Sequence, residues 1–383
     1  MKLCHVITRM IVGGAQENTL YTCRGHLEKG HEVTLVTGPS PGPEGKLLER
    51  TCPPGLRIVL LPDLVREISP WHDWKTYRAL RKLFREEHFD VVHTHASKAG
   101  ILGRIAAWKE HVPFVVHTVH GNAFGPFASR LQNFLYIHLE RMAAKRCHKI
   151  FTVAQAMIEQ GINANIAPRG KYKVVYSGMD LDAFASAKPD AELRSKLGIP
   201  EGAPVVGTIA RLFALKGHDV LLNAAPLILK AVPETRFLLV GDGILRGELE
   251  AQARALGIAD RVVFAGLVDP SEVCRYTALM TVLAHLSLRE GLPRAAVQAL
   301  AARVPVVAYP LDGTPEVVLP EKTGLLVPPE DVQAVADAVI RLLKEPSLRA
   351  QMGETGQHFV LERFDWHTMA DILEEEYKNG TAS

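Results

Sequence analysis

The chain has 383 residues, of which 47% are hydrophobic and 22% charged, and its net charge is +2. This length allows two domains with separate cores, and the balanced charge gives no indication of a nucleic-acid partner. The five cysteines form no Cys-x-x-Cys pair, so the sequence suggests neither a zinc ribbon nor a disulfide framework. No apolar run reaches the roughly 20 residues that a membrane span needs, and the apolar N-terminal stretch is too short for a signal peptide. We therefore expect a cytoplasmic protein.

Short apolar runs alternate with segments of helical period along the whole chain, which predicts an α/β protein built from βαβ units with parallel sheets. In the first half, strands are expected at 3–7, 33–37, 57–60, 90–95, 114–120, 149–153 and 174–176, with helices up to about residue 30, at 71–87 and at 126–147. In the second half, strands are expected at 205–209, 237–240, 262–265 and 304–308, with another ending near Leu288 and a last helix at about 366–378. Because the pattern restarts at Val205, two domains are expected.

A glycine pair, Gly13-Gly14, follows the first predicted strand. Glycine tolerates a positive φ and lets the backbone approach a ligand closely, as a phosphate-binding loop needs. An ordinary turn explains the pair about as well.

Four histidines lie at the C-terminal ends of two predicted strands: His93, His95, His117 and His120. Ligands of a doubly wound sheet bind outside these ends. His93 and His95 share one face of their strand, which a metal site would need, but no nearby Asp, Glu or Cys completes a ligand set of recognisable spacing. We therefore expect these histidines to make hydrogen bonds and not to hold a metal.

Asp180 and Asp182 form an Asp-x-Asp pair, a motif that binds manganese in one large class of enzymes. Here the pair follows a completed α/β domain and begins a connecting segment. We interpret both residues as turn and capping residues and not as a metal site.

Two cations, Arg211 and Lys216, stand in the loop after the first strand of the second half. An Arg fork and a Lys point charge at a strand's C-terminal end can bind a diphosphate. On spacing alone, a solvated basic loop is an equally good interpretation.

The run Gly241-Asp242-Gly243, with Gly247 further on, mimics a dinucleotide-binding Gly-x-Gly. It does not follow the first strand of its unit, and no ribose-binding acid stands at the expected strand end. A nicotinamide site is therefore not expected.

The stretch from residue 285 to residue 300 predicts a buried strand, an acidic turn and a helix that begins at Pro293. Backbone N–H groups at Gly291, Leu292 and the first helical turn would favour an anion. Glu290 beside them suits the hydroxyl groups of a sugar, and Gln298 can reach a ligand that lies along the helix. The alternative is an ordinary strand-to-helix turn.

Glu290-Gly-Leu-Pro followed by a helix of small residues resembles the Glu-x7-Glu signature of retaining glycosyltransferases of family 4, which have the GT-B architecture. The resemblance implies that Glu290 contacts the transferred sugar and that position 298 contacts the ribose of the nucleotide. This chain departs from the signature because residue 298 is Gln. An amide can still donate to and accept from ribose hydroxyls.

Further motifs extend the resemblance over nearly the whole chain: the N-terminal glycine loop, His120, the Arg…Lys-Gly spacing, Gly-Asp-Gly and a Thr-Gly-Leu-Leu-Val-Pro segment at 323–328. They imply that the glycine loop lines an interdomain cleft, that His120 faces the donor sugar, and that residues 97–100 and 122–124 line the acceptor side. The implied catalytic residues are His120, Glu290, Arg211 and Lys216. The implied donor-binding residues are Gly13, Gly14, Arg211, Lys216, Gly241, Gly243, Leu267, Glu290, Gly291, Leu292, Pro293 and Gln298.

The resemblance predicts two Rossmann-like domains facing across a cleft: an N-terminal acceptor-side domain at 1–177, a linker at 178–203 and a donor-binding domain at 204–365, with a C-terminal helix at about 366–380 that packs back on the first domain. The implied activity is transfer of a sugar, with retention, from a nucleotide donor, expected to be a UDP-sugar, to a glycan, lipid-linked or small-molecule acceptor. No metal or other cofactor is expected.

This activity suits the synthesis of cell-envelope polysaccharide, and peripheral contact with the inner face of the membrane is a further hypothesis. Two alternatives stay open: a nucleotide-sugar epimerase or hydrolase on the same fold, and a nucleotide-sugar-binding protein that has lost catalysis.

Overall fold

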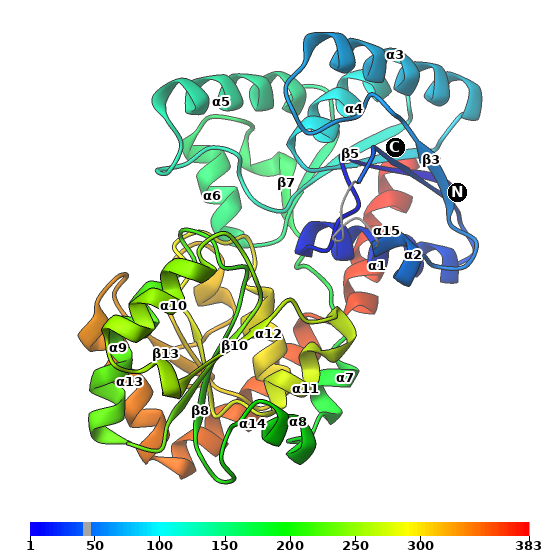
Figure 1. The fold of residues 1–383 in the computed structure, drawn as a ribbon. Helices are drawn as coiled ribbons and strands as arrows, with labels where there is room; N and C mark the ends of the chain where they lie inside the picture. Colours follow the sequence, from blue (N-terminus) through cyan, green and yellow to red (C-terminus); the bar gives the residue numbers. More distant parts are fainter. Residues whose placement is uncertain (41–46, 383) are drawn as a thin grey trace. The chain divides into compact units, whose positions relative to one another are not determined.

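The computed structural model describes residues 1–40 and 47–382 (Figure 1). The chain divides into two compact units, one made of Met1–Met179 with Phe364–Ser383 and the other of Asp180–Arg363. The segment 178–203, expected as a linker, carries two short helices, and from Asp180 onward it belongs to the second unit.

Each unit contains one parallel sheet, as the alternating sequence pattern predicts (Figure 1). Among the described residues, the first sheet has seven strands in the order β3-β2-β1-β4-β5-β6-β7. Its strands are β1 (Lys2–Ile7), β2 (Glu32–Thr37), β3 (Arg57–Leu60), β4 (Val91–His95), β5 (Phe114–Val119), β6 (Lys149–Thr152) and β7 (Tyr172–Val174). The strand order reverses between β1 and β4, which is where a doubly wound sheet opens a crevice for ligands.

Helices cover both faces of the first sheet. They are α1 (Gly14–Glu28), α2 (Leu47–Thr51), α3 (Pro70–Glu87), α4 (Ser97–Lys109), α5 (Arg130–Ala144), α6 (Gln155–Asn163) and α15 (Trp366–Thr381). The C-terminal helix α15 packs against α1, and its Met369, Leu373 and Tyr377 are buried with Leu3 and Ile7 of β1. Burial of this apolar helix face removes it from water, which is why the end of the chain returns to the first unit.

The second sheet has six strands within the described chain, in the order β10-β9-β8-β11-β12-β13. They are β8 (Val205–Ile209), β9 (Arg236–Val240), β10 (Val262–Gly266), β11 (Val282–His285), β12 (Val306–Ala308) and β13 (Gly324–Leu326). Its helices are α7 (Asp182–Ser186), α8 (Ala191–Lys196), α9 (His218–Ala231), α10 (Arg246–Ala255), α11 (Val273–Ala278), α12 (Arg294–Ala301), α13 (Val332–Lys344) and α14 (Pro346–Arg363). Here the order reverses between β8 and β11, so the loops after these two strands flank the expected ligand crevice.

Two predicted boundaries in the first unit are wrong. Helix α5 begins at Arg130 and not at residue 126, because Ser129 and Gln132 form a capping box that starts the helix there. Strand β7 covers Tyr172–Val174 and not residues 174–176, since its register on β6 pairs Tyr172 with Ile150.

The strand-to-helix segment of the second unit also differs from its prediction. Strand β11 ends at His285 and not near Leu288, because the Leu288 N–H donates to the carbonyl of Leu215 outside the sheet. Pro293 is the N-cap of α12 and not its first residue: its φ of −75° suits a helix, but its ψ of 82° does not. The turn between strand and helix is therefore longer than predicted.

Candidate functional site

The loops after β8 and β11 contact each other through the residues on either side of Lys216. Leu215 and Gly217 on either side of it have positive φ angles of 69° and 70°. A Cβ at Gly217 would lie 2.3 Å from the carbonyl oxygen of Leu286, and the Leu215 carbonyl accepts from the Leu288 N–H at 2.8 Å. A non-glycine residue in the left-handed region is uncommon and costs free energy, and such residues gather at functional sites. The two loops therefore hold the Lys216 backbone in place.

Lys216 and Glu290, predicted separately as phosphate and sugar contacts, form an ion pair. The Lys216 Nζ lies 2.6 Å from Oε1 of Glu290 and 3.3 Å from the hydroxyl of Ser287. The backbone N–H of Glu290 donates to the Asp312 carboxylate at 2.8 Å, and Nε2 of His285 lies 3.5 Å from Oε1 of Glu290. Lys216 and His285 thus converge on the Glu290 carboxylate, and Asp312, from the loop after β12, holds the Glu290 backbone.

Neighbouring groups keep the Glu290 carboxylate ionised. Burial by itself raises the pKa of Glu290, but His285, Lys216 and Ser287 together outweigh it, so this pKa lies below the usual range. Burial lowers the pKa of His285 despite the nearby carboxylate, so His285 is neutral at physiological pH. The site therefore holds a carboxylate beside an ammonium, with a neutral imidazole.

The glycine loop after β9 packs tightly on the loop after β8. A Cβ at Gly241 would lie 2.1 Å from the carbonyl oxygen of Ala210, and one at Gly243 would lie 2.4 Å from that of Leu212. The Leu212 N–H donates to the Asp242 carbonyl at 2.9 Å. Only glycine fits here, because the backbones touch.

Two further predicted residues lie in neighbouring loops of the second unit. The guanidinium of Arg211 lies 5.1 Å from the centre of the Phe213 ring, directly after β8. Leu267, directly after β10, is 64% exposed, and the carbonyl of the preceding Gly266 accepts from the Gly241 N–H at 3.0 Å. The loops after β8, β9 and β10 are therefore neighbours at the same edge of the sheet.

The start of α12 places the remaining predicted donor contacts. Leu292 and Pro293 are buried, Gly291 is half-buried, and Gln298 lies half-buried on the second turn of the helix. Gln298 is thus on the helix that begins next to Glu290, as the spacing predicted.

In the first unit, neither glycine of the Gly13-Gly14 pair has the positive φ that glycine tolerates. Gly13 has a φ of 173°, which is ordinary extended backbone, and Gly14 is the first residue of α1. Gly13 instead serves as the N-cap of α1, and its carbonyl accepts from the Glu17 N–H at 3.0 Å.

The acceptor-side residues expected in the first unit lie at two helices. Residues 97–100 form the first turn of α4, where Lys98 makes an ion pair with Asp73 of α3 at 2.6 Å. The amide of Asn122 donates to Gln160 of α6 at 2.6 Å. These contacts fix the two segments on neighbouring elements.

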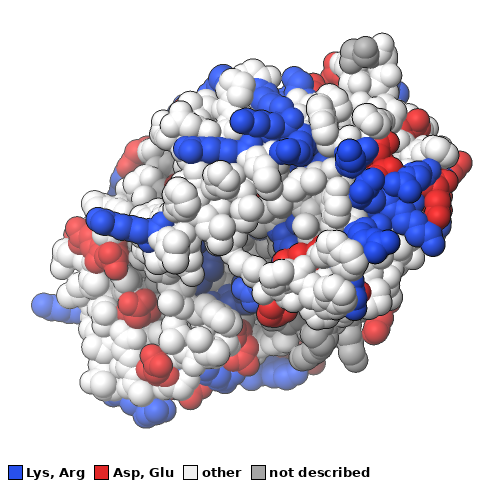
Figure 2. All heavy atoms as spheres, turned by 90° about the horizontal axis from the view of Figure 1, so that it is seen from above, with Lys and Arg blue, Asp and Glu red and all other residues white. Residues whose placement is uncertain are grey.

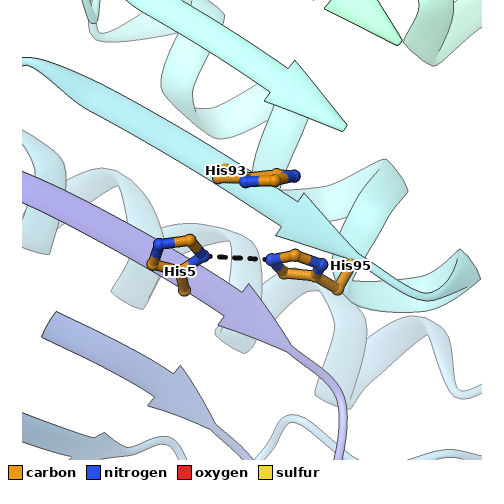
Figure 3. A group of neighbouring side chains, drawn as sticks. All are labelled: His5, His93 and His95. Carbon is orange, nitrogen blue, oxygen red and sulfur yellow. Dashed lines mark hydrogen bonds between the residues drawn. The ribbon is translucent and has the colours of Figure 1, made fainter. Parts of the chain in front are cut away.

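His120 lies directly after β5 and is half-buried. Its Nε2 is 3.1 Å from Nδ1 of His95. Nε2 of His95 is in turn 3.1 Å from Nδ1 of His5, a contact that Figure 3 shows as a dashed line. His5 and His95 are completely buried. The structure thus joins His120 to a row of core histidines that includes His5, which the sequence motifs did not indicate.

One group of metal-ligand types occurs among the described residues: His5, His93 and His95, whose ring nitrogens lie within 4.8 Å of one another (Figure 3). Asp180 and Asp182 do not belong to such a group. The Asp182 N–H donates to the Asp180 carboxylate at 3.4 Å, as in a turn.

Sequence reasoning missed His285, Ser287 and Asp312, which surround the Lys216–Glu290 pair. One signal was available, because His285 and Ser287 lie among the last residues of the strand that was predicted to end near Leu288. Asp312 is 22 residues from Glu290 along the chain, so only the tertiary fold reveals its contact. Among the described residues, no helix is long and apolar enough to cross a membrane.

The two Rossmann-like sheets are those of the GT-B fold that the sequence motifs predicted. Two family models match the chain: "Glycosyltransferase Family 4" over residues 12–183 and "Glycosyl transferases group 1" over residues 189–359. The chain belongs to this family of glycosyltransferases.

Among its relatives, the UDP-Gal:α-D-GlcNAc-diphosphoundecaprenol α-1,3-galactosyltransferase of Escherichia coli is 28% identical over 381 residues, covering 98% of this chain and 96% of the relative. The D-inositol 3-phosphate glycosyltransferase of Streptomyces scabiei is 31% identical over 309 residues, covering 76% of this chain and 68% of the relative. A crystal structure of Anabaena HepE with UDP and glucose has a TM-score of 0.83 at 22% identity, covering 99% of this chain and all of that one. The structural likeness confirms the predicted fold.

Proposed function

We propose that this glycosyltransferase moves a sugar from a UDP-sugar to a lipid-linked or glycan acceptor with retention of configuration. The observation that carries the proposal is the ammonium of Lys216, held between two loops at the β8/β11 crevice and 2.6 Å from Glu290. A UDP donor is supported by the names of the Escherichia coli relative and of the Anabaena complex.

The chemistry that Lys216 and Arg211 would perform is charge stabilisation. When the bond from the sugar to the diphosphate breaks, negative charge grows on the leaving phosphate, and positioned cations lower the energy of that transition state. Lys216 is held in place before substrate arrives, so little reorganisation accompanies the reaction. Glu290 and His120 would hold the sugar hydroxyls, and attack from the face that the leaving group departs from is what the family resemblance implies.

We also propose that the reaction needs no metal ion. The Asp180–Asp182 pair forms a turn, and two cations are available for the diphosphate. Treatment with EDTA is therefore expected to leave the transfer rate unchanged. Loss of activity that manganese restores would contradict this proposal.

A lipid-linked acceptor and a role in making cell-envelope polysaccharide are supported by the undecaprenol-linked substrate in the name of the Escherichia coli relative. The test is a panel of UDP-, GDP-, ADP- and dTDP-sugars, first for binding by thermal shift and then for transfer to a synthetic polyprenyl-diphosphate sugar. We expect UDP-sugars to bind, and NMR of the product to show the anomeric configuration of the donor. Selective binding of another nucleotide sugar would refute the proposed UDP donor. A product with the opposite anomeric configuration would refute the proposed retention.

The same panel tests the two alternatives. Consumption of the donor without any acceptor would indicate an epimerase or a hydrolase. Binding without turnover on any acceptor would indicate a protein that has lost catalysis.

Helix α5 supports a peripheral contact with a membrane surface. Its Leu131, Phe134 and Leu135 share one face by their spacing and are 76%, 70% and 41% exposed. Exposed cations, Arg130 and Lys145, lie at the start and after the end of the helix. Figure 2 shows the face of the first unit that carries α3, α4 and α5, with many blue Lys and Arg side chains on it. Apolar and basic side chains together favour binding to an anionic lipid surface.

Vesicle sedimentation tests this contact, with phosphatidylcholine vesicles that contain or lack phosphatidylglycerol. Binding is expected only to the anionic vesicles, and the double substitution Leu131→Ser with Phe134→Ser should abolish it. Leu60→Ser is the matched control, because Leu60 is 64% exposed on the edge strand β3 of the same unit. Equal binding by the α5 variant and the control would contradict the proposal.

A further inference from the structure

Three neighbouring strands place histidines in a diagonal row on one face of the first sheet. The parallel register pairs His5 of β1 with His93 of β4, and His95 of β4 with Thr118 of β5. His95 is therefore two residues further along than His5, and His120 is two residues beyond Thr118. Because side chains alternate along a strand, all of these residues face the same side. The row rises toward the carboxyl edge of the sheet and ends at His120.

Each ring in the row is linked to the next by one nitrogen-to-nitrogen contact of 3.1 Å, from His5 Nδ1 to His95 Nε2 and from His95 Nδ1 to His120 Nε2. Burial lowers the pKa of His5 to about 3 and the pKa of His95 well below its usual value. Both rings are therefore neutral at neutral pH, and each carries a single ring proton. A neutral imidazole that donates through one nitrogen must accept through the other, so both hydrogen bonds run in the same direction.

The direction follows from the buried end of the row. Nε2 of His5 is fully buried and has no hydrogen-bond partner among the described residues. A buried N–H without an acceptor is rarer in proteins than an acceptor that lacks a donor. The proton of His5 is therefore on Nδ1 and is donated to His95. His95 in turn donates its Nδ1 proton to Nε2 of His120, which leaves the proton of His120 on Nδ1.

A metal ion held by His5, His93 and His95 is the competing explanation of this cluster. Nδ1 of His93 contacts the hydroxyl of Tyr377, and its Nε2 lies 2.6 Å from the hydroxyl of Thr118. The rings of His93 and His95 lie one over the other, with centres 4.2 Å apart and planes at 32° (Figure 3). A metal binds in the plane of an imidazole, so rings arranged in this way do not aim at a common point. Hydrogen bonds explain these contacts without an ion.

We propose that His95, supported by His5, is a positioning residue that holds His120 in the tautomer with its proton on Nδ1. In this state His120 offers the donor sugar a hydrogen-bond donor at Nδ1, while its Nε2 lone pair is occupied by His95. His120 therefore binds a sugar oxygen that accepts a hydrogen bond from Nδ1. Because its Nε2 is occupied, His120 does not take up a proton from the substrate through Nε2. This inference rests on the sugar contact proposed for His120.

The direct test is NMR of the full-length protein labelled with ¹⁵N-histidine, with the His120 signals assigned from the spectrum of His120→Gln. In the wild type we expect a single His120 tautomer, protonated at Nδ1, with a coupling across the bond from His95 to His120. His95→Leu removes the donor to Nε2, so the other tautomer of His120 should rise roughly tenfold or more. His117→Asn is the control, because His117 is equally buried on β5 but contacts Thr94 and not this row; its His120 signals should match those of the wild type.

Two substitutions at position 5 test the direction. His5→Leu offers no acceptor to His95, so His120 should stay protonated on Nδ1. His5→Asp offers a carboxylate acceptor, which should draw the His95 proton to Nε2 and reverse the tautomer of His120. If His5→Asp does not fold, the spectrum of His95→Leu still decides whether His95 fixes the tautomer of His120.

A wild-type His120 protonated on Nε2, or a His95→Leu spectrum that matches the wild type, would overturn the inference. So would stoichiometric zinc in the purified protein together with loss of the coupling. None of these measurements depends on turnover. If the NMR results hold and His120→Gln transfers sugar at the wild-type rate, the sugar contact proposed for His120 fails instead.

Discussion

At the scale of single residues, Lys216 is held in place by both its side chain and its backbone. Its ammonium faces Glu290 and Ser287, and its backbone lies between two residues with positive φ. Such a residue is built to hold one position, and a donor diphosphate would meet a cation that is already oriented.

We predict that Lys216→Ala and Arg211→Ala each lower kcat and raise the donor KM. Each should cost about 2 to 4 kcal/mol of transition-state stabilisation, which is the scale for removing one preorganised donor. Steady-state kinetics with the donor found in the panel measure the effect. Lys230→Ala, an exposed lysine on α9, is the control and should match the wild type. Wild-type kinetics from both site variants would remove the diphosphate assignment.

Gln298 and Glu290 should separate nucleotide binding from sugar transfer. If Gln298 contacts the ribose, Gln298→Ala loses an uncharged hydrogen bond of about 0.5 to 1.5 kcal/mol, so UDP should bind several-fold more weakly. Gln298→Glu should keep or strengthen UDP binding through a charge-assisted bond. Glu290→Gln should leave UDP affinity unchanged and depress kcat, because it is proposed to contact the sugar. Calorimetric titration of UDP into the three variants decides, and unchanged binding by Gln298→Ala would show that this amide does not contact the nucleotide.

At the scale of elements, the loops at the carboxyl edge of the second sheet are positioned by direct contact between their backbones. Gly243 belongs to the loop after β9 and Leu212 to the loop after β8, and a side chain between them has no space. The position of Arg211 therefore depends on a residue that need not contact the donor at all.

We predict that Gly243→Ala weakens UDP binding and lowers the melting temperature, since its Cβ would lie 2.4 Å from a backbone oxygen. Gly247→Ala, four residues further on in α10, is the matched control, because no atom lies within 4 Å of the Cβ it would add. The control should bind UDP normally and should not lose stability, because Gly247 lies in the first turn of α10 and alanine favours a helix more than glycine does. Equal UDP affinity in the two variants would show that the glycine loop is not needed for the site.

At the scale of the whole molecule, the described part of the first unit buries five imidazoles in and around its sheet. Burial lowers the pKa of each, and these histidines are His5, His26, His93, His95 and His117. All of them ionise in the unfolded chain near the ordinary value of 6.5. Folding therefore requires them to stay neutral.

This requirement predicts acid sensitivity. Above pH 6.5 these histidines are neutral in both the folded and the unfolded chain, so the free energy of unfolding does not depend on their ionisation. Below pH 6.5 the histidines of the unfolded chain take up protons, whereas those of the folded unit do not. Each group then removes up to about 1.4 kcal/mol of stability per pH unit, until the folded pKa is reached, which is about 3 for His5. Carboxylates such as Glu87, with a pKa of about 2, weaken the fold only below their ordinary 4.5. Calorimetry between about pH 7.5 and pH 5.5 should show the unfolding transition of the first unit moving to lower temperature, and a constant transition over this range would contradict the prediction.

The sequence alone was sufficient for the two parallel sheets and for most strands, because apolar runs bounded by turn residues report burial directly. The sequence motifs also selected Lys216 and Glu290, and the structure brings the two side chains together in an ion pair, but their roles at the donor stay a prediction. The first residue of α5 and the first residue of α12, expected at Pro293, were mispredicted. Capping and loop hydrogen bonds set these helix boundaries, and the spacing of hydrophobic residues does not report them.

Only the tertiary structure decided which distant side chains meet. The ion pair of Lys216 with Glu290, the Asp312 carboxylate on the Glu290 backbone, and the row from His5 to His120 join residues that are 22 to 90 positions apart. Such contacts depend on strand order and register, which local sequence patterns do not encode. His5 shows the reason most clearly: in the sequence it is one polar residue in an apolar strand, and its neighbours are set by the pairing of β1 with β4.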